Sequence, residues 1–363
     1  MGKIRESFHG SDLEVIAKRY QIDIDSIIPY ASNVNPLGIS PMARQALLEH
    51  IDAISAYPDR DYVSLKSSIC SYCGARAEQL VLGNGTSDLI RLTFETLAPN
   101  KTLIVGPTYS EYARTARLFG SEIQTYMLKD SDNFELDVEL LLRQLNASID
   151  LLILCNPNNP TGQALDTGQI TRILEHCQTH SIQMMIDETY VEFVKDLSSI
   201  SSIGLTGQYD NLIVLRSVSK FFAAPGIRLG YAITGNRTFL EATSNGTIPW
   251  NINTYASIAG VMFEDKEYID TTRSLIQTER HLVYSALSSR KTIKVFKPSS
   301  NYILIKLLKE DLTASEVFEY CIKQGFMIRD CTDYEGLGEK YIRFCFMKPE
   351  QDDNIVNTLL EIV

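Results

Sequence analysis

The sequence lacks any long hydrophobic run, since no apolar stretch approaches the roughly 18 to 20 residues of a membrane-spanning helix. Its first ten residues also lack the apolar centre of a signal peptide. Positive charge is scarce, because 34 Lys and Arg stand against 45 Asp and Glu, for a net charge of −11. Such a surface does not attract nucleic acid or anionic lipid. We expect a cytoplasmic protein, in which a local basic pocket must draw any anionic ligand.

The cysteines are too few and too irregular for a disulfide framework. There are seven of them, scattered from Cys70 to Cys345, and an odd number fits reduced thiols. The pair Cys70 and Cys73 has no second pair to complete a zinc site. His176 and His180 are one helical turn apart, but no metalloprotease-type carboxylates surround them. We therefore expect no metal site.

The sequence also has no P-loop and no G-x-G-x-x-G after its first apolar run, which disfavours a nucleotide-binding site. What it does have is a regular alternation from residue 80 onward, in which short apolar runs are separated by helical stretches. This alternation is typical of an α/β fold with a largely parallel sheet covered on both faces. The runs are 80–82, 102–105, 122–127, 151–155, 183–186, 212–215 and 230–234.

The chain of 363 residues is long enough for one large domain and a smaller companion. We expect residues 1–40 to form an arm that belongs to the small domain and covers the active site. Residues 41–250 form the large domain in this prediction, beginning with a helix over 41–54. Residues 251–363 contain a long connecting helix over about 254–289 and then a small α+β domain. No linker separates these parts, which favours packed lobes.

Chemically informative residues follow the apolar runs. Because the carboxyl ends of parallel strands share one edge of a sheet, we expect these residues to form one site. Gly85 and Thr86 open a helix whose free N–H groups and dipole favour a phosphate. Tyr109 offers an aromatic face on which a planar ring can stack. The loop Asn156-Pro157-Asn158-Asn159-Pro160-Thr161-Gly162 is rich in turn residues, and its amides can donate to a phenolate-like oxygen or a carboxylate.

Asp187 directly follows the apolar run at 183–186. A carboxylate buried at the end of such a run is costly unless it is paired with a cation. A protonated pyridine nitrogen is such a cation, and Tyr190 is placed to reach the oxygen of the same ring. Lys220 follows the next run, directly behind two hydroxyls and ahead of an arginine. The lysine can form an imine, and the other three groups can hold a phosphate dianion: Ser217, Ser219 and Arg228. The pattern indicates an aldehyde cofactor that carries a phosphate.

These motifs resemble the fold-type I pyridoxal-phosphate enzymes of the class I/II aminotransferase superfamily, nearly from end to end. The resemblance implies a large domain with a mostly parallel central sheet and a small α+β domain. It implies that Lys220, Asp187 and Tyr190 are catalytic, and that Asn159 also contacts the ring oxygen. It further implies a homodimer with shared active sites, in which Tyr57 reaches the neighbouring subunit's cofactor. The implied cofactor residues are Tyr57, Gly85, Thr86, Tyr109, Asn159, Asp187, Tyr190, Ser217, Ser219, Lys220 and Arg228.

Within the superfamily the chain looks most like the threonine-phosphate decarboxylases of cobalamin biosynthesis, and next like the histidinol-phosphate aminotransferases. The arm favours the decarboxylases, because it has His9-Gly10 before a short helix and then Asn33-Val34-Asn35-Pro36-Leu37-Gly38. Ser11 stands where those relatives usually have a second glycine. Two carboxy-terminal arginines match as well. The substrate residues implied by this likeness are His9, Gly10, Asn33, Asn159, Arg329 and Arg343.

The implied activity is that of a carbon-carbon lyase that acts on O-phospho-L-threonine. Its product is an aminoalkyl phosphate for the nucleotide loop of cobalamin. O-phospho-L-serine, which is smaller by one methyl group, stays open as a substrate. A histidinol-phosphate or related aminotransferase remains an alternative, as does a non-catalytic binding protein. The sequence does not determine which arginine binds which anion.

Overall fold

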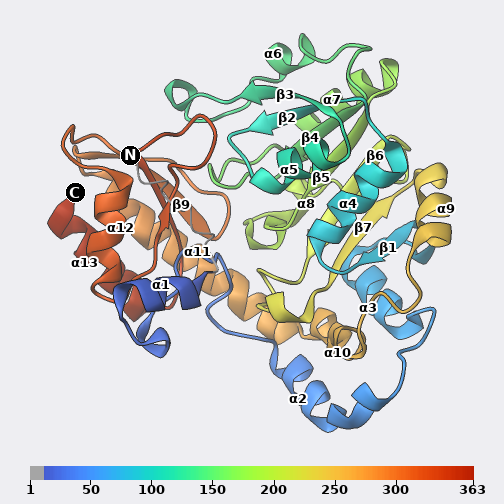
Figure 1. Cartoon of the computed structure of the whole chain (residues 1–363), viewed down its shortest axis with the longest axis horizontal. Coiled ribbons are helices and arrows are strands. Elements are labelled where there is room, and N and C mark those ends of the chain that lie inside the picture. The colour runs from blue at the N-terminus through green and yellow to red at the C-terminus, as the bar shows by residue number, and fades with distance from the viewer. Residues whose placement is uncertain (1–11) are drawn as a thin grey trace.

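The computed structural model describes residues 12–363, and it contains two β-sheets. Figure 1 shows the larger sheet, with its helices, beside the smaller one. The large sheet has seven strands in the order β1-β7-β6-β5-β4-β2-β3. All the apolar runs predicted as its strands are confirmed: β1 (Leu80–Gly83), β2 (Lys101–Gly106), β3 (Glu122–Met127), β4 (Leu151–Cys155), β5 (Gln183–Asp187), β6 (Leu212–Ser217) and β7 (Gly230–Thr234).

The large sheet is mostly parallel, as predicted. Strands β3, β2, β4, β5 and β6 run parallel to one another, whereas β7 is antiparallel to both β6 and β1. The antiparallel direction of β7 has a consequence for the site. Its first residue, Gly230, pairs with Ser217 at the end of β6 and with Gly83 at the end of β1. The start of β7 therefore lies on the same edge as the carboxyl ends of its neighbours.

Helices cover both faces of this sheet, because alternate side chains of the buried strands point to opposite sides. Ile153 and Ile213 belong to the core beneath one group of helices, and Leu152 and Val214 belong to the core on the other side. The helices of the first face are α4 (Thr86–Leu97), α5 (Ser110–Leu118) and α9 (Arg237–Gly246); α7 (Thr167–Thr179) covers the second. The short helices α6 (Val138–Leu142) and α8 (Leu197–Ile200) complete this part.

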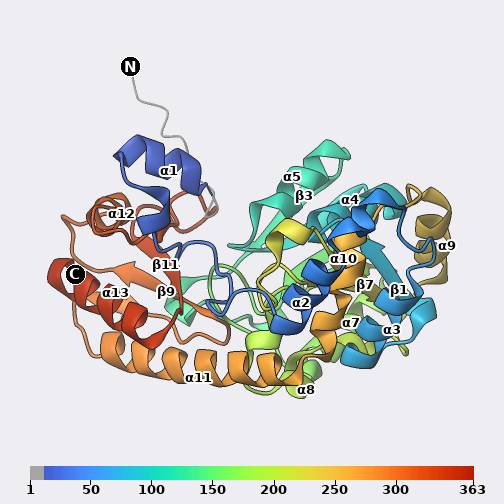
Figure 2. The same cartoon turned by 90° about the horizontal axis from the view of Figure 1, so that it is seen from below.

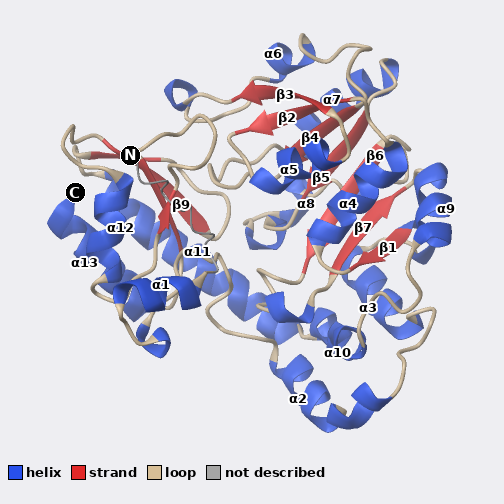
Figure 3. Ribbon diagram, in the orientation of Figure 1, coloured by secondary structure: helices blue, strands red, loops and turns tan. Residues whose placement is uncertain are grey.

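The small sheet is antiparallel, with the order β10-β11-β9-β8. Figure 3 shows it apart from the large sheet. The arm after α1 (Leu13–Tyr20) packs on its edge, where Cys345 N donates to Tyr30 O at 2.9 Å and Ala31 N donates to Met327 O at 2.7 Å. The strands of this sheet are β8 (Ile293–Val295), β9 (Tyr302–Leu307), β10 (Arg329–Asp330) and β11 (Tyr341–Cys345), and the helices in the same stretch of chain are α12 (Ala314–Ile322) and α13 (Pro349–Ile362).

The single helix predicted over about 254–289 is wrong. The chain forms α10 (Thr254–Ile258), a 3-10 segment (Ala259–Glu264) and α11 (Lys266–Ser288). Asp265 causes the restart, because its carboxylate accepts from Tyr268 N at 3.2 Å and caps the new helix. Ser40 Oγ also donates to Asp265 at 2.6 Å. This hydrogen bond joins the helix cap to a segment far away in the sequence, and such a contact cannot be predicted from sequence periodicity. Figure 2 shows α11 along the lower edge of that view, extending from beneath β9 toward the part that holds the large sheet.

The helix predicted over 41–54 is likewise shorter. It is α2 (Pro41–Glu49), followed by a 3-10 segment (Ile51–Ser55) and, after a loop, by α3 (Val63–Cys73). Within residues 12–363, no helix combines the length and the apolar character that a bilayer crossing needs.

Candidate active site

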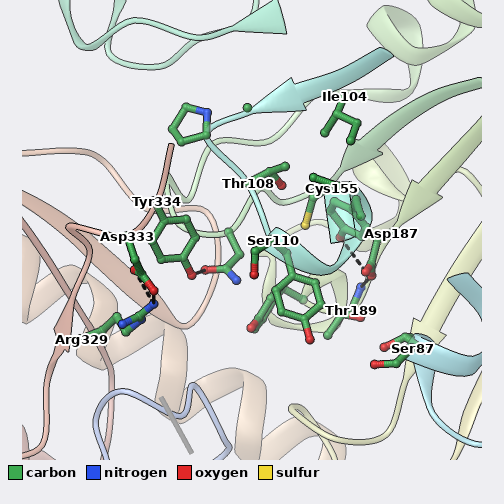
Figure 4. Close-up of a pocket in the computed structure, with 18 of the residues that line it drawn as sticks. Ser87, Ile104, Thr108, Ser110, Cys155, Asp187, Thr189, Arg329, Asp333 and Tyr334 are labelled. Atoms are coloured by element: carbon green, nitrogen blue, oxygen red, sulfur yellow. Dashed lines mark hydrogen bonds and ion pairs between the residues drawn. The ribbon is translucent and has the colours of Figure 1, made fainter. Parts of the chain in front are cut away.

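A cavity of about 650 Å³ lies at the carboxyl edge of the large sheet and extends toward the small one. Figure 4 shows part of its lining. Most of the side chains predicted from the sequence line it, although they come from segments up to 257 residues apart, from Thr86 to Arg343. They are Thr86, Tyr109, Asn159, Asp187, Tyr190, Ser217, Ser219, Lys220, Arg228, Arg329 and Arg343.

Lys220 lies three residues beyond the end of β6, and its ammonium group donates to Ser32 O at 2.6 Å. Burial lowers the pKa of Lys220 from 10.5 to about 8, and the nearby charge of Arg343 adds to the shift. The backbone also ties this residue to the arm, since Asn35 N donates to Lys220 O at 3.0 Å. A buried lysine with a lowered pKa has more of the neutral amine that attacks an aldehyde.

Asp187 ends β5 at the floor of the cavity. Its two oxygens accept from Tyr112 Oη at 2.7 Å and from Thr189 N at 2.9 Å. Burial raises the pKa of Asp187, because those two neutral donors only partly offset the loss of water. Figure 4 shows Asp187 at the cavity with a marked hydrogen bond. The carboxylate thus lies where a cationic ligand atom would stabilise its charge.

A small-residue cup occupies the edge where β1, β6 and β7 meet. Ser217 and Ser219 have their hydroxyls 2.9 Å apart, and Arg228 Nη1 donates to Pro225 O at 3.1 Å. Gly85 adopts φ +83 just before α4, and a Cβ there would lie 2.4 Å from Arg228 Nη2. Gly230 has no room for a side chain either, because a Cβ would lie 2.8 Å from two backbone atoms, Gly85 C and Thr86 N. The glycines allow the hydroxyls, the guanidinium and the helix N-terminus to converge.

The inner wall joins the large sheet to the small one through Arg343 on β11. Its Nη1 donates to Asn159 Oδ1 and, at 3.2 Å, to Tyr334 Oη, while Nη2 donates to Ala31 O at 2.8 Å. Arg343 is only 4% exposed, and its buried Nε has no hydrogen-bond partner in the described chain. A buried donor without a partner is costly, so this group is suited to an anionic or carbonyl ligand.

Asn33 approaches the site from the arm without lining the cavity. It is buried with φ 56, a conformation that asparagine adopts more readily than most residues, and its Nδ2 donates to Tyr190 Oη at 3.3 Å. Burial raises the pKa of Tyr190, so the phenol is held in its neutral form. Asn33 therefore positions Tyr190 in this structure.

Besides Asn33, two other predicted residues do not line the cavity, and two lie outside the described chain. Tyr57 is 78% exposed and packs against Trp250 at a ring distance of 4.6 Å, so it does not reach the cavity of its own chain. Gly85 stands beneath Arg228 without lining the cavity. His9 and Gly10 lie outside the described residues.

The sequence prediction missed several residues that contribute to the cavity. Tyr112 follows Tyr109 by one helical turn, a spacing that could have marked it. Thr189 lies between two predicted residues and also lines the cavity. Ser32 contributes a backbone carbonyl, which no sequence signal identifies. Asp333 and Tyr334 line the outer part of the cavity from the loop after β10.

The residues present fit the predicted cofactor. The cup offers the two hydroxyls, guanidinium and helix N-terminus that a phosphate requires, and Lys220 is a partly neutral amine inside the same cavity. Asp187 is a buried carboxylate that lacks a cationic partner in the described chain. Tyr109 is half-buried beside Tyr112 and presents an aromatic face.

Comparison with known proteins agrees with this geometry. Residues 25–359 match the family model for aminotransferase class I and II. The threonine-phosphate decarboxylase of Salmonella typhimurium is 28% identical, covering 98% of this chain and 97% of that protein. The histidinol-phosphate aminotransferase of Methanosphaera stadtmanae is 30% identical over 98% of this chain and 95% of its own. The crystal structure of the histidinol-phosphate aminotransferase from Clostridium acetobutylicum superimposes with a TM-score of 0.85 at 31% identity, covering 92% of this chain and 98% of that one.

Proposed function

Because the chain belongs to the class I and II aminotransferase family, we propose that it is a pyridoxal-phosphate enzyme that decarboxylates O-phospho-L-threonine. O-phospho-L-serine is the second substrate to test. The product would be an aminoalkyl phosphate, as needed for the nucleotide loop of cobalamin. The observation that carries this proposal is that two arginines, Arg329 and Arg343, line the same cavity as Lys220 and Asp187.

The cofactor of this family is pyridoxal 5′-phosphate. When bound, it withdraws electrons from the α-carbon of an amino-acid substrate, which weakens the bonds at that carbon. We assign its phosphate to the cup of Ser217, Ser219 and Arg228, with the N–H groups at Gly85 and Thr86. We assign its ring nitrogen to Asp187, which keeps that nitrogen protonated, and its ring oxygen to Asn159 and Tyr190. Tyr109 is the proposed stacking partner.

The two arginines suit a substrate with two anionic groups, since each guanidinium can bind an anion bidentately. Arg343 is the arginine whose charge lowers the pKa of Lys220, and it is buried. We assign it to the α-carboxylate, which is attached directly to the reacting carbon. Arg329 lies further out, on β10, and is assigned to the phosphate, which is separated from that carbon by intervening atoms.

The reaction requires the enzyme to select which bond at the α-carbon breaks. The enzyme selects the bond by anchoring the other substituents of the α-carbon. The proposed role of the two arginines is therefore to orient the substrate. Lys220 is the proposed proton donor to the α-carbon after carbon dioxide leaves, since its pKa of about 8 lets it both hold and release a proton near neutral pH. His9, Gly10 and Asn33 of the arm are proposed to complete the substrate site.

The test is release of carbon dioxide by the purified holoenzyme with O-phospho-L-threonine, O-phospho-L-serine and histidinol phosphate. We expect release from the first two only. Lys220→Ala should abolish both the visible absorbance of bound cofactor and the activity. Absence of carbon dioxide with either phosphoamino acid would refute the decarboxylase assignment.

An aminotransferase acting on histidinol phosphate is the second candidate, favoured by the structural match at 31% identity. In that case an amino substrate alone would convert the cofactor to its amino form, and an added keto acid would restore the original absorbance. No carbon dioxide would be produced. The same preparation of enzyme distinguishes the two activities.

We also propose that two copies of the chain form a dimer with shared sites. Tyr57 and its stacking partner Trp250 are exposed, 78% and 40% respectively, in a region where further apolar side chains are exposed. The others there are Met42, Leu48, Ile51, Ile54, Val63 and Ile248. Burying this face against a second copy would bring Tyr57 to the partner's phosphate cup. Sedimentation should show a dimer, and Tyr57→Phe should weaken cofactor retention. A monomer with full activity would contradict this.

A further inference from the structure

Tyr112 brings a phenol to the floor of the cavity from the first turn of α5. The residue is fully buried, and its Oη donates to Asp187 Oδ2 at 2.7 Å. Its ring meets the Tyr109 ring edge-on, with the ring centroids 5.6 Å apart, which fixes the direction of the hydroxyl. Burial, together with the nearby charge of Asp187, raises the pKa of Tyr112. The phenol therefore keeps its proton and directs it at Asp187.

The other groups next to Asp187 are uncharged as well. Thr189 N donates to Asp187 Oδ1 at 2.9 Å. Cys155 pairs with Asp187 across β4 and β5, and burial raises the pKa of its thiol to about 12, so the thiol is neutral. Among residues 12–363 the Asp187 carboxylate has no ion-pair partner, so its charge depends on these neutral donors.

Burial and hydrogen bonding change the basicity of Asp187 in opposite directions. Burial raises the pKa of Asp187, whereas the hydrogen bonds from Thr189 and Tyr112 lower it. A hydrogen bond to a charged acceptor is stronger than one to a neutral acceptor. The Tyr112 hydroxyl therefore stabilises the charged carboxylate more than the protonated acid, and it makes Asp187 a weaker base than burial alone would make it.

We propose that Tyr112 is a positioning residue, which keeps Asp187 charged so that the proton between this carboxylate and the cofactor stays on the ring nitrogen. This rests on the proposed function in one respect, namely that the ring nitrogen of pyridoxal phosphate lies against Asp187. The carboxylate and the nitrogen then share one proton, and the more basic of the two holds it. The Tyr112 hydroxyl favours a protonated nitrogen, because that arrangement leaves the negative charge on Asp187.

The position of this proton determines how strongly the ring withdraws electrons from the α-carbon of the substrate. A ring with a protonated nitrogen is a strong electron sink, whereas a neutral ring beside a protonated Asp187 is a weaker one. Tyr112 acts on the ring only through Asp187. Its effect is needed whether the α-carbon loses a carboxylate or a proton, so the proposal applies to a decarboxylase and to an aminotransferase.

The test is Tyr112→Phe, which removes the hydroxyl and keeps the ring that packs on Tyr109. Nitrogen-15 NMR of the holoenzyme, loaded with ring-labelled pyridoxal phosphate, distinguishes a protonated from an unprotonated ring nitrogen. We expect less protonated nitrogen in the variant, and turnover lower by about tenfold, as for the loss of one hydrogen bond to a charged group. In the cofactor-free variant, an infrared titration should show Asp187 taking up its proton at a higher pH than in the unmodified protein. The Asp187 signal is identified by its loss in Asp187→Asn.

The matched control is Tyr231→Phe, which removes the hydroxyl of another buried tyrosine that does not line the cavity and has no hydrogen-bond partner in the described chain. It should leave the nitrogen signal and the titration unchanged. When Asp187→Asn is already present, adding Tyr112→Phe should lower turnover no further, because the charged acceptor is gone. An unchanged nitrogen signal or titration in Tyr112→Phe, or equal changes in Tyr231→Phe, would overturn the proposal. Failure of the proposed decarboxylation would appear separately, as absence of carbon dioxide, with both spectroscopic results still measurable.

Discussion

The lowered pKa of Lys220 gives a prediction for the enzyme before it binds its cofactor. With a pKa of about 8 in place of 10.5, the fraction of neutral amine at pH 7 is about 300 times larger than for an ordinary lysine. Because only the neutral amine attacks an aldehyde, the rate at which the cofactor-free enzyme reacts with pyridoxal phosphate should rise with pH and level off above about pH 8.

The perturbation is Arg343→Met, which removes the charge that contributes to the lowered pKa of Lys220. The midpoint of the pH–rate curve should move upward but stay below 10.5, because burial is the larger cause and remains. Arg343→Lys keeps a charge and should keep the midpoint close to that of the unmodified enzyme. The rate is followed by stopped-flow absorbance after mixing with the cofactor. A midpoint near 10.5 in the unmodified enzyme, or no shift in Arg343→Met, would refute this reasoning.

Three further outcomes test other parts of the structure. Gly230→Ala should raise the dissociation constant of the cofactor by about tenfold, because the added Cβ would overlap backbone atoms. Gly226→Ala is the control, since its Cβ would have nothing within 4 Å, and it should leave the dissociation constant unchanged. Equilibrium dialysis measures both. Asp187→Asn should lower the turnover rate at saturating cofactor by a factor of about 10² to 10³, because the ring nitrogen of the cofactor loses the carboxylate that balances its charge. Full activity in this variant would contradict the proposed pairing of Asp187 with the ring nitrogen. Burial, with Glu279 and Asp353 nearby, raises the pKa of Asp352 from 3.8 to about 8, so the folded state binds this proton more tightly and is stabilised at low pH. Stability should fall as pH rises from about 4 to about 8, by up to about 1.4 kcal/mol per pH unit, and Asp352→Asn should flatten this slope in urea unfolding; parallel curves would disprove it.

The large sheet could be predicted from the sequence because all its strands except β3 are buried on both faces. Runs such as 151–155 and 212–215 are continuously apolar, and the first of them is followed directly by a loop rich in Asn, Pro and Gly. The positions of Lys220 and Asp187 at strand ends follow from the same pattern. Helix ends were less predictable: the break before α11 depends on Asp265 contacting Ser40, more than two hundred residues away.

The sequence by itself determined the residue types at the strand ends, and through them the family and its cofactor. Tertiary structure alone decided how those residues are paired. In the folded chain Tyr112 is hydrogen-bonded to Asp187, Asn33 to Tyr190, and Arg329 to Asp333. Arg343 has no carboxylate partner among the described residues. The physical reason is that a motif reports local backbone geometry and residue type. The charge and pKa of a buried group depend instead on neighbours that only the folded chain brings within hydrogen-bond distance.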